Sequence, residues 1–283
     1  MTLFTVVNKP EVQNPVLIIG VTGWGDAAAA ASDAVDWLAE DGTIVAHFDP
    51  DKVFDYRSNR PIIRTSAGEQ MILSWPRLSI IHTVVGGVDV LMLAGNEPDY
   101  RWQGIGKHLV EFAEQNDVAK VVTVGSIPTP VRHSMPTAVI STASDSRLLV
   151  AGDDMLIDNV IVPASAGTAF RALLEDAGFP TVGYWAQVPQ YVARPYAPAV
   201  YSLLSKIAAQ LDVDLDLDDI ESEAHEHVAR LDELLAKRSD ARELVEGLDV
   251  TFGTTAHVPM DLPTADEIAA EFTKFLESSG EDE

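Results

Sequence analysis

The chain has 283 residues, of which 47% are hydrophobic, and its formal net charge at pH 7 is −25. It contains no cysteine, which excludes disulfides, thiolate metal ligands and cysteine nucleophiles. The acidic balance argues against nucleic acid or an anionic membrane as a partner, and the sequence has neither an apolar run of about 18 residues nor a secretory signal, so we expect a cytoplasmic protein.

The first elements predict a β-α-β unit. PVLIIGV, residues 15–21, is a continuous apolar run, which is typical of a strand covered on both faces. The alanine-rich residues 26–40 favour a helix, and GTIVAHFD, residues 42–49, predicts a second strand. This crossover is long enough to connect parallel strands.

Between residues 56 and 95, β-rich runs alternate with turn signals, which predicts short, partly antiparallel strands and a hairpin. Residues 99–117 form an amphipathic pattern and predict a helix. Further along, strands are expected at residues 119–126, 136–144 and 180–192, and helices at 166–178 and 198–212. This alternation predicts an α/β fold, a three-layer α/β/α sandwich that occupies residues 1–212.

The character of the chain changes after Asp212. From there to Glu283 we count 22 acidic and 5 basic residues, a net charge of −17. The pattern predicts an acidic helical C-terminal subdomain over residues 213–283, with a last helix at 263–279 that has a capping-box spacing at its start. A solvated acidic surface is the simpler interpretation of this charge, and a docking site for a basic partner is the alternative.

A glycine-rich turn, GVTGWGD at residues 20–26, follows the first predicted strand. Residues 23–28 fit a G-x-G-x-x-A variant of the dinucleotide fingerprint, but Trp24 is bulky for such a loop, and the lysine of a P-loop is absent. Asp26 is at the expected helix N-cap, where its carboxylate would bind the amides that a phosphate needs. The turn is therefore predicted to be a capped strand–helix junction, with small-ligand binding as the alternative.

Two further strand ends carry polar clusters. GNEPDYRWQG, residues 95–104, offers Glu97 and Arg101 beside aromatic side chains, and VGSIPTPVRHSMP, residues 124–136, offers Arg132 and His133. Ligands of α/β proteins bind at the carboxyl ends of strands. The structural alternative is a helix entry for residues 95–104 and a proline-ordered loop for residues 124–136. A ligand cleft at these ends would be formed by Trp24, Asp26, Glu97, Arg101, Arg132 and His133.

The remaining candidates are weaker. Ser165 and Thr168 stand at a strand–helix junction that could bind an anion or merely cap a helix. His225 and His227 are two residues apart, so on a helix they point to different faces, and we expect no metal site. The sequence has no G-x-S-x-G elbow and no other complete catalytic motif, and no cofactor is expected.

The chain resembles the proteasome assembly chaperone 2 family, in its actinobacterial-type branch. The resemblance covers most of residues 15–212, and it rests on the order and spacing of GWGDAAAAASDAVDWL (23–38), Arg60-Pro61, GNEPDYRW (95–102), RHSMP (132–136) and VPQYVA (188–193). It implies a three-layer α/β/α core similar to nucleoside phosphorylases, a helical appendage, and self-association. Eukaryotic and archaeal relatives assist proteasome assembly by binding protein rather than by catalysis.

The chain departs from the family at two motifs. Relatives often have Pro-His-Thr-Arg-Pro where this chain has RHSMP, which retains His133 and Pro136 and has Met135 at the arginine position. Likewise, a family Val-Pro-His-Tyr is Val-Pro-Gln-Tyr at residues 188–191. The missing histidine weakens a transferred catalytic role.

Two hypotheses follow. The first is a non-enzymatic, homo-oligomeric protein that binds a proteasome-related protein partner in the manner of an assembly chaperone. It would use the loops near residues 95–102 and 128–136, with the acidic tail as a cover or docking arm. The second is a small-molecule-binding protein or a nucleoside phosphorylase- or hydrolase-like enzyme that uses the cleft at the strand ends. A self-assembling scaffold without another role is a third possibility.

Overall fold

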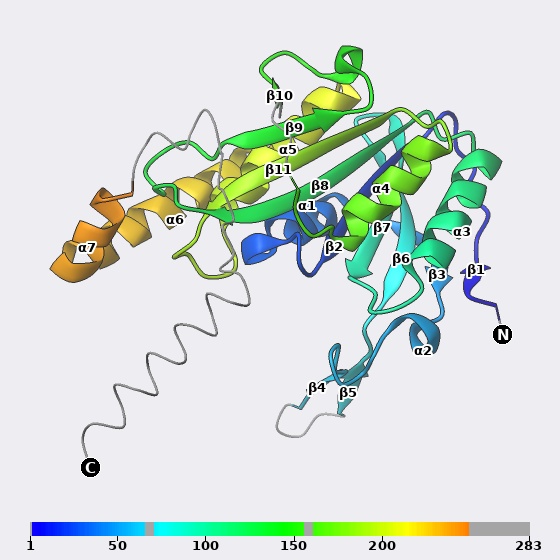
Figure 1. The fold of residues 1–283 in the computed structure, drawn as a ribbon, viewed down its shortest axis with the longest axis horizontal. Coiled ribbons are helices and arrows are strands. Elements are labelled where there is room, and N and C mark those ends of the chain that lie inside the picture. Colours follow the sequence, from blue (N-terminus) through cyan, green and yellow to red (C-terminus); the bar gives the residue numbers. More distant parts are fainter. Residues whose placement is uncertain (1, 66–70, 156–160, 249–283) are drawn as a thin grey trace, which may run out of the picture. The chain divides into compact units, whose positions relative to one another are not determined.

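A nine-stranded mixed sheet forms the centre of the fold (Figure 1). The computed structural model describes residues 2–65, 71–155 and 161–248. In spatial order, the strands are β1 (Phe4–Val6), β3 (Thr43–Phe48), β6 (Leu78–Val85), β7 (Val88–Asn96), β2 (Val16–Thr22), β8 (Lys120–Thr129), β11 (Thr181–Pro189), β9 (Val139–Ala143) and β10 (Asp154–Met155).

The middle of the sheet is parallel. Strand β2 pairs in parallel with both β7 and β8, and β8 pairs in parallel with β11. Strand β6 is antiparallel to β7 and to β3, and β9 is antiparallel to β11. Because parallel strands end at the same edge of a sheet, the segments that follow β2, β7, β8 and β11 meet at one carboxyl edge.

Helices cover both faces of this sheet. Helices α1 (Ala30–Leu38) and α5 (Ala197–Leu211) pack against one face, and α3 (Trp102–Gln115) and α4 (Ala166–Asp176) pack against the other. Strand β2 is apolar throughout because it is covered on both faces. Ile18 lies in the core under α1 and α5, and Ile19 lies in the core under α3 and α4. The predicted three-layer α/β/α architecture is therefore confirmed.

The N-terminal β-α-β prediction needs one refinement. Strand β3 runs parallel to β2, as expected, but the β6–β7 hairpin lies between them. The alanine-rich segment forms a 3₁₀ turn (Ala27–Ala29) before α1, and Ala28 and Ala29 have left-handed φ values of 52° and 59°. The helix consequently begins at Ala30, later than the sequence indicates. Strands β1 and β10, at the two ends of the sheet, were not predicted.

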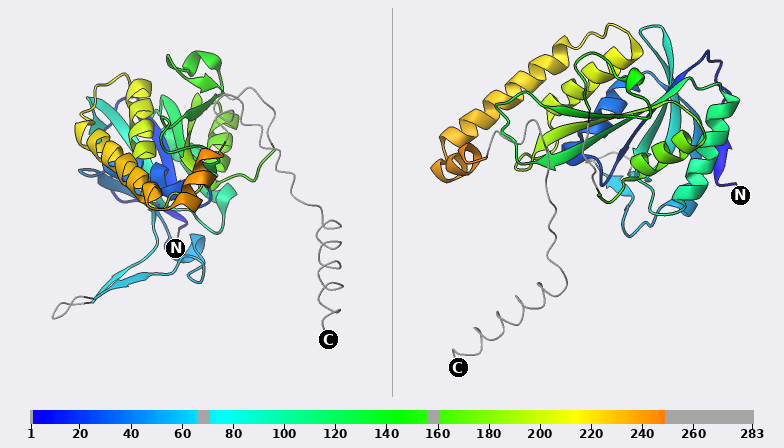
Figure 2. Two further views of the ribbon diagram at one scale, coloured as in Figure 1. Left: turned by 90° about the vertical axis from the view of Figure 1, so that its left-hand side faces the viewer. Right: turned by 45° about the horizontal axis from the view of Figure 1, so that its top comes forward.

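A second, two-stranded ribbon extends away from the main sheet (Figures 1 and 2). It consists of β4 (Ile62–Arg64) and β5 (Ile72–Ser74), paired antiparallel, and the short helix α2 (Pro50–Val53) precedes it. We call residues 62–74, within the described ranges, the hairpin arm. The antiparallel strands and hairpins predicted for this region are present.

Helix α6 (Asp218–Ala236) packs along α5, and its buried Ala224 and partly buried Ile220 and Leu231 extend the core on that side. The short helix α7 (Ser239–Glu246) follows it. The helix predicted at 263–279 lies outside the described residues, so the division of the chain at residue 212 stays a prediction. A second short 3₁₀ segment is Ser146–Leu148.

Candidate functional site

The glycine-rich turn after β2 and the segment after β7 meet at the carboxyl edge. The carboxylate of Glu97 connects them: its Oε2 accepts a hydrogen bond from the Trp24 amide at 2.9 Å, and its Oε1 accepts one from the Ala166 amide at 2.7 Å. Gly23 has a φ of 126°, and a Cβ there would lie 2.3 Å from Glu97 Oε2. The amides of the turn and of the α4 N-terminus thus already hold an anion, which is the side chain of Glu97.

Asp26 acts as a helix cap. Its Oδ1 accepts hydrogen bonds from the amides of Ala31 (2.8 Å) and Ser32 (3.2 Å), and its Oδ2 accepts one from Ser32 Oγ at 2.6 Å. Burial raises the pKa of this carboxyl, although the hydrogen bonds from Ser32 and Ala31 oppose the shift. This geometry supports the junction interpretation of the turn, because Asp26 and Glu97 occupy the donors that a phosphate would need.

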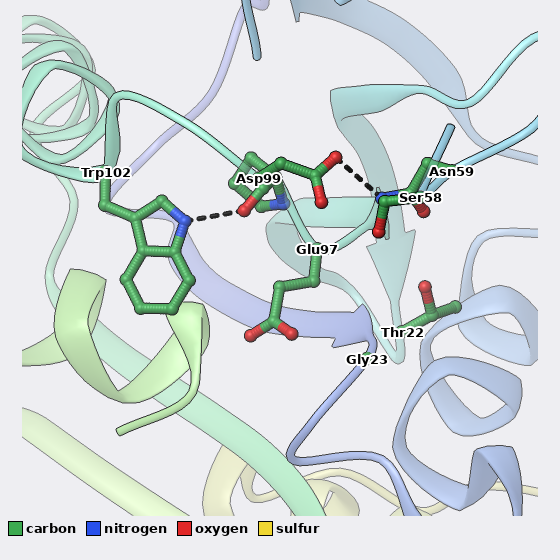
Figure 3. A pocket seen from close by; sticks show the side chains of 8 residues that line it. Thr22, Gly23, Ser58, Asn59, Glu97, Asp99 and Trp102 are labelled. Atoms are coloured by element: carbon green, nitrogen blue, oxygen red, sulfur yellow. Dashed lines mark hydrogen bonds between the residues drawn. The ribbon is translucent and has the colours of Figure 1, made fainter. Parts of the chain in front are cut away.

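A pocket of about 420 Å³ opens beside Glu97. It is lined by residues from three segments of this edge, namely Thr22, Gly23, Ser58, Asn59, Glu97, Pro98, Asp99 and Trp102. In the view of Figure 3, Trp102 and the Ser58–Asn59 turn lie on opposite sides, with the side chains of Glu97 and Asp99 between them.

The polar groups of this pocket are held in place. Asp99 Oδ2 accepts hydrogen bonds from the Asp55 amide and from Asn59 Nδ2, both at 2.8 Å. The indole Nε1 of Trp102 donates to the carbonyl of Pro98 at 2.6 Å (Figure 3). Since Asn59 belongs to the turn that leads into the hairpin arm, Asp99 ties the base of the arm to the sheet edge.

Arg132 and His133 form a separate cluster after β8. The His133 ring is buried and has a hydrogen-bond partner at each nitrogen. Its Nδ1 is 2.7 Å from Tyr191 Oη, and its Nε2 is 3.1 Å from Oδ1 of Asp232, which is on α6. The His133 amide also donates to Tyr191 Oη at 2.8 Å. Arg132 donates from Nε to the Leu248 carbonyl at 3.1 Å and from Nη2 to the Glu246 carbonyl. This cluster fastens α6 and the end of α7 to the loop between β8 and β9.

The structure therefore divides the six predicted cleft residues. Trp24, Asp26 and Glu97 belong to the glycine-rich turn and its contacts, and Glu97 is the one of the six that lines the pocket. Trp24 is 67% exposed, and Arg101 is exposed with a left-handed φ of 63° immediately before α3. Arg132 and His133 instead contact the C-terminal helices. A ligand role for these residues stays a prediction.

Other candidates have simpler roles here. Ser165 caps α4, accepting a hydrogen bond from the Thr168 amide at 3.2 Å. Within the described residues no group of three or more His, Cys, Asp or Glu side chains is arranged to hold a metal ion. None of the helices in the same residues combines the length and hydropathy needed to cross a membrane.

Sequence reasoning missed several partners. Asp99 lies in the polar segment at residues 95–104, but it was not chosen as a cleft residue, and Asn59 was noted only as part of a turn signal. Asp232 gave no local signal, because it is one acidic residue among many on α6. Asn59 and Asp99 are 40 positions apart in the chain, and His133 and Asp232 are 99 apart.

Comparisons with known proteins identify relatives. A family model described as "PAC2 family" matches residues 20–235. Among solved structures, a protein of unknown function from Corynebacterium glutamicum is 29% identical, with a TM-score of 0.82, over 88% of this chain and 96% of that one. A proteasome-assembly chaperone homologue of Mycobacterium tuberculosis is 30% identical, with a TM-score of 0.72, over 81% of this chain and 99% of that one.

A more distant match shows the same fold. An archaeal proteasome activator of Pyrococcus furiosus has a TM-score of 0.64 at 14% identity, over 84% of this chain and 98% of that one. A search of curated protein sequences gives no match. The implied similarity to nucleoside phosphorylases is not confirmed and stays a prediction.

Proposed function

Since the chain belongs to the PAC2 family, we propose that it is a non-enzymatic, self-associating cytoplasmic protein that binds other proteins in the manner of an assembly chaperone. Its similarity to a proteasome-assembly chaperone homologue and to a proteasome activator makes a proteasome-related partner our first expectation. The six predicted cleft residues do not share one set of contacts, since Trp24, Asp26 and Glu97 belong to the glycine-rich turn and Arg132 and His133 contact the C-terminal helices. This favours binding over catalysis.

The observation that carries this proposal is the apolar surface of the hairpin arm. Side chains alternate between the two faces of a ribbon, and the register pairs Ile63 with Leu73 on one face. The alternation adds Met71 and Trp75 to this face, and all four side chains are between 45% and 59% exposed. The opposite face is mixed, because Ile62 and Ile72 share it with Arg64 and Ser74. We call the first face the apolar arm face.

An exposed apolar face of this kind marks an interaction surface. A two-stranded ribbon is marginally stable on its own, and it also presents unpaired strand edges that readily pair with another chain. We infer that the apolar arm face packs against a second copy of the chain, which gives the self-association that the family resemblance implies.

The two faces of the arm provide a matched experiment. Ile63→Thr with Leu73→Thr removes apolar surface from the apolar arm face, and Ile62→Thr with Ile72→Thr removes a similar amount from the mixed face. Threonine keeps the strand propensity of isoleucine. We expect analytical ultracentrifugation to show that the first pair weakens self-association by at least about 100-fold, which is roughly 2.7 kcal/mol. The second pair should change it little. Equal effects of the two pairs, or association unchanged by the first, would overturn the role of this face.

Partner binding needs its own test. Native mass spectrometry of the protein, purified gently from its own host, should show complexes with host proteasome subunits at defined stoichiometry. A homo-oligomer that carries no other protein would overturn the assembly role and leave a self-assembling scaffold.

A further inference from the structure

We propose that the pocket beside Glu97 binds a small organic cation, recognised through an ammonium group by the carboxylates of Glu97 and Asp99. This site is independent of the self-association proposed above. Its volume of about 420 Å³ falls within the usual range for small-molecule pockets, and it lies at the carboxyl edge of parallel strands, where α/β proteins bind ligands.

The charge of the lining selects the ligand class. Two of the eight lining residues are carboxylates, and none is Lys, Arg or His. The hydroxyl groups of Thr22 and Ser58 and the amide of Asn59 can orient a neutral part of the ligand through hydrogen bonds. A phosphate or a carboxylate would meet uncompensated negative charge here, whereas an ammonium group would make charge-assisted hydrogen bonds.

Two amide donors at this edge are already occupied by Glu97. The amides of Trp24 and Ala166, which would otherwise attract a phosphate, both donate to Glu97. These two bonds fix the carboxylate of Glu97 without neutralising it. The glycine-rich turn thereby presents a fixed negative group to the pocket, the reverse of a phosphate-binding loop.

Asp99 is held as firmly, and it keeps an acceptor for a ligand. Its Oδ2 accepts the two hydrogen bonds from the turn at residues 55–59, while among the described residues Oδ1 receives none. The side chain of Trp102 is fixed by its bond to Pro98 and by an edge contact with Phe170 at a centroid distance of 6.4 Å. Side chains that are held by neighbouring hydrogen bonds and packing are what a preorganised binding site requires.

The test uses two probes of the same skeleton. The cation 4-aminobutan-1-ol carries an ammonium and a hydroxyl group, and butane-1,4-diol is its neutral counterpart. We expect isothermal titration calorimetry of the full chain, at near-neutral pH and physiological salt, to detect the amine with a dissociation constant below about 10 mM. The diol and inorganic phosphate should not bind. On amine binding, hydrogen exchange should slow in the turn at residues 54–60.

The variant Asp99→Asn removes the charge and keeps an amide oxygen that can accept the bonds from Asp55 and Asn59. It should weaken amine binding at least about tenfold, because a hydrogen bond to a charged group is lost. Asp176→Asn makes the same charge change at an exposed position at the far end of α4 and should leave binding unchanged. Binding of phosphate or the diol as tightly as the amine, equal losses in the two variants, or no binding of the amine would each overturn the proposal.

Discussion

At the scale of single residues, the carboxylate of Asp26 supplies a hydrogen-bond acceptor for two amides at the start of α1. Asp26→Ala leaves the amides of Ala31 and Ser32 without their acceptor. Loss of a cap of this kind costs about 1–2 kcal/mol of unfolding free energy. Asp26→Asn retains an amide oxygen for the same donors and should cost much less. Urea unfolding of the two variants measures the difference, and equal losses would contradict the capping role.

The same residue makes stability depend on pH. Burial raises the pKa of Asp26 above its ordinary value of 3.8. A raised folded-state pKa gives stability that is complete below the unfolded pKa and is lost as the pH rises through the folded pKa. Relative to Asp26→Asn, the native protein should therefore lose stability as pH increases over this interval. Unfolding curves of both proteins measured upwards from a pH below 3.8 cover this interval, and a constant or reversed difference across it would contradict the trend.

Gly23 lies directly against Glu97. An alanine Cβ at this position would lie 2.3 Å from Glu97 Oε2, whereas a Cβ at Gly87, which also has a positive φ of 88°, would meet nothing within 4 Å. Both Gly→Ala substitutions incur backbone strain of about 1–3 kcal/mol, and Gly23→Ala should lose about 1–3 kcal/mol more through overpacking. In a Glu97→Ala background this additional loss should diminish. Thermal or urea unfolding of the four variants tests it, and equal losses at the two glycines would show that Glu97 does not constrain the turn.

These residue contacts also show what the sequence alone could reveal. The rule that ligands and polar groups gather at strand ends identified Glu97 and the glycine-rich turn. It could not pair them, because Glu97 is 73 residues from Trp24 and 69 from Ala166. Likewise, His133 is 99 residues from Asp232. A pattern of residue types does not specify which of many acidic side chains the fold brings to a histidine.

At the scale of elements, the loop between β8 and β9 holds the C-terminal helices. Arg132→Ala removes the hydrogen bonds to the carbonyls of Glu246 and Leu248, and Asp232→Ala removes the acceptor of the His133 ring. We expect hydrogen exchange to accelerate by about fivefold in α7 for the first variant and in the second half of α6 for the other, because each loss is about 1 kcal/mol. Arg147→Ala, whose partner Asp145 is local, serves as the control.

Exchange that is unchanged in both variants would mean that packing of α6 on α5 is sufficient to hold these helices. Because α6 covers part of α5 through Ile220 and Leu231, deletion from residue 213 would disturb the core as well as any docking surface. The point substitutions separate these two effects.

Elements were predicted well where their local pattern agrees with their packing. Strand β2 is apolar on both faces because helices cover both faces, and α3 shows the expected apolar stripe. The start of α1 was misplaced because Ala28 and Ala29 adopt left-handed backbone conformations that alanine rarely takes. Here the tertiary arrangement, with Asp26 turned to the amides of α1, overrides the helix propensity of alanine.

At the scale of the whole molecule, sequence order is a poor guide to the order of strands. A β-α-β unit suggests neighbouring strands, yet the β6–β7 hairpin separates β2 from β3. This hairpin turns at Gly86 and Gly87, and its strand β6 is antiparallel to both β7 and β3. Nothing local in β2 or β3 encodes the insertion, because it depends on which apolar strands pair most favourably once all are present.

The net charge of −25 per chain gives the proposed self-association a defined dependence on salt. Copies of such a chain repel one another, while the apolar arm face attracts through burial of uncharged side chains. Salt reduces the range of charge repulsion from about 30 Å at 0.01 M to about 3 Å at 1 M and leaves apolar burial in place. We therefore expect self-association to strengthen by at least about tenfold between roughly 0.02 M and 0.5 M NaCl, as measured by sedimentation velocity.

The opposite trend would identify a different interface. Residues 57–77, which are the hairpin arm and the segments on either side of it, contain four arginines and one glutamate in a strongly acidic chain. This part of the chain could also attract the acidic helices of a second copy. Ion pairs between exposed groups weaken as salt increases, and association that falls with salt would therefore assign the contact to these arginines. The Ile63→Thr, Leu73→Thr variant distinguishes the cases further. If apolar burial dominates, this variant should weaken association by at least about 100-fold at every salt concentration. If ion pairs dominate, the variant should leave association at low salt intact.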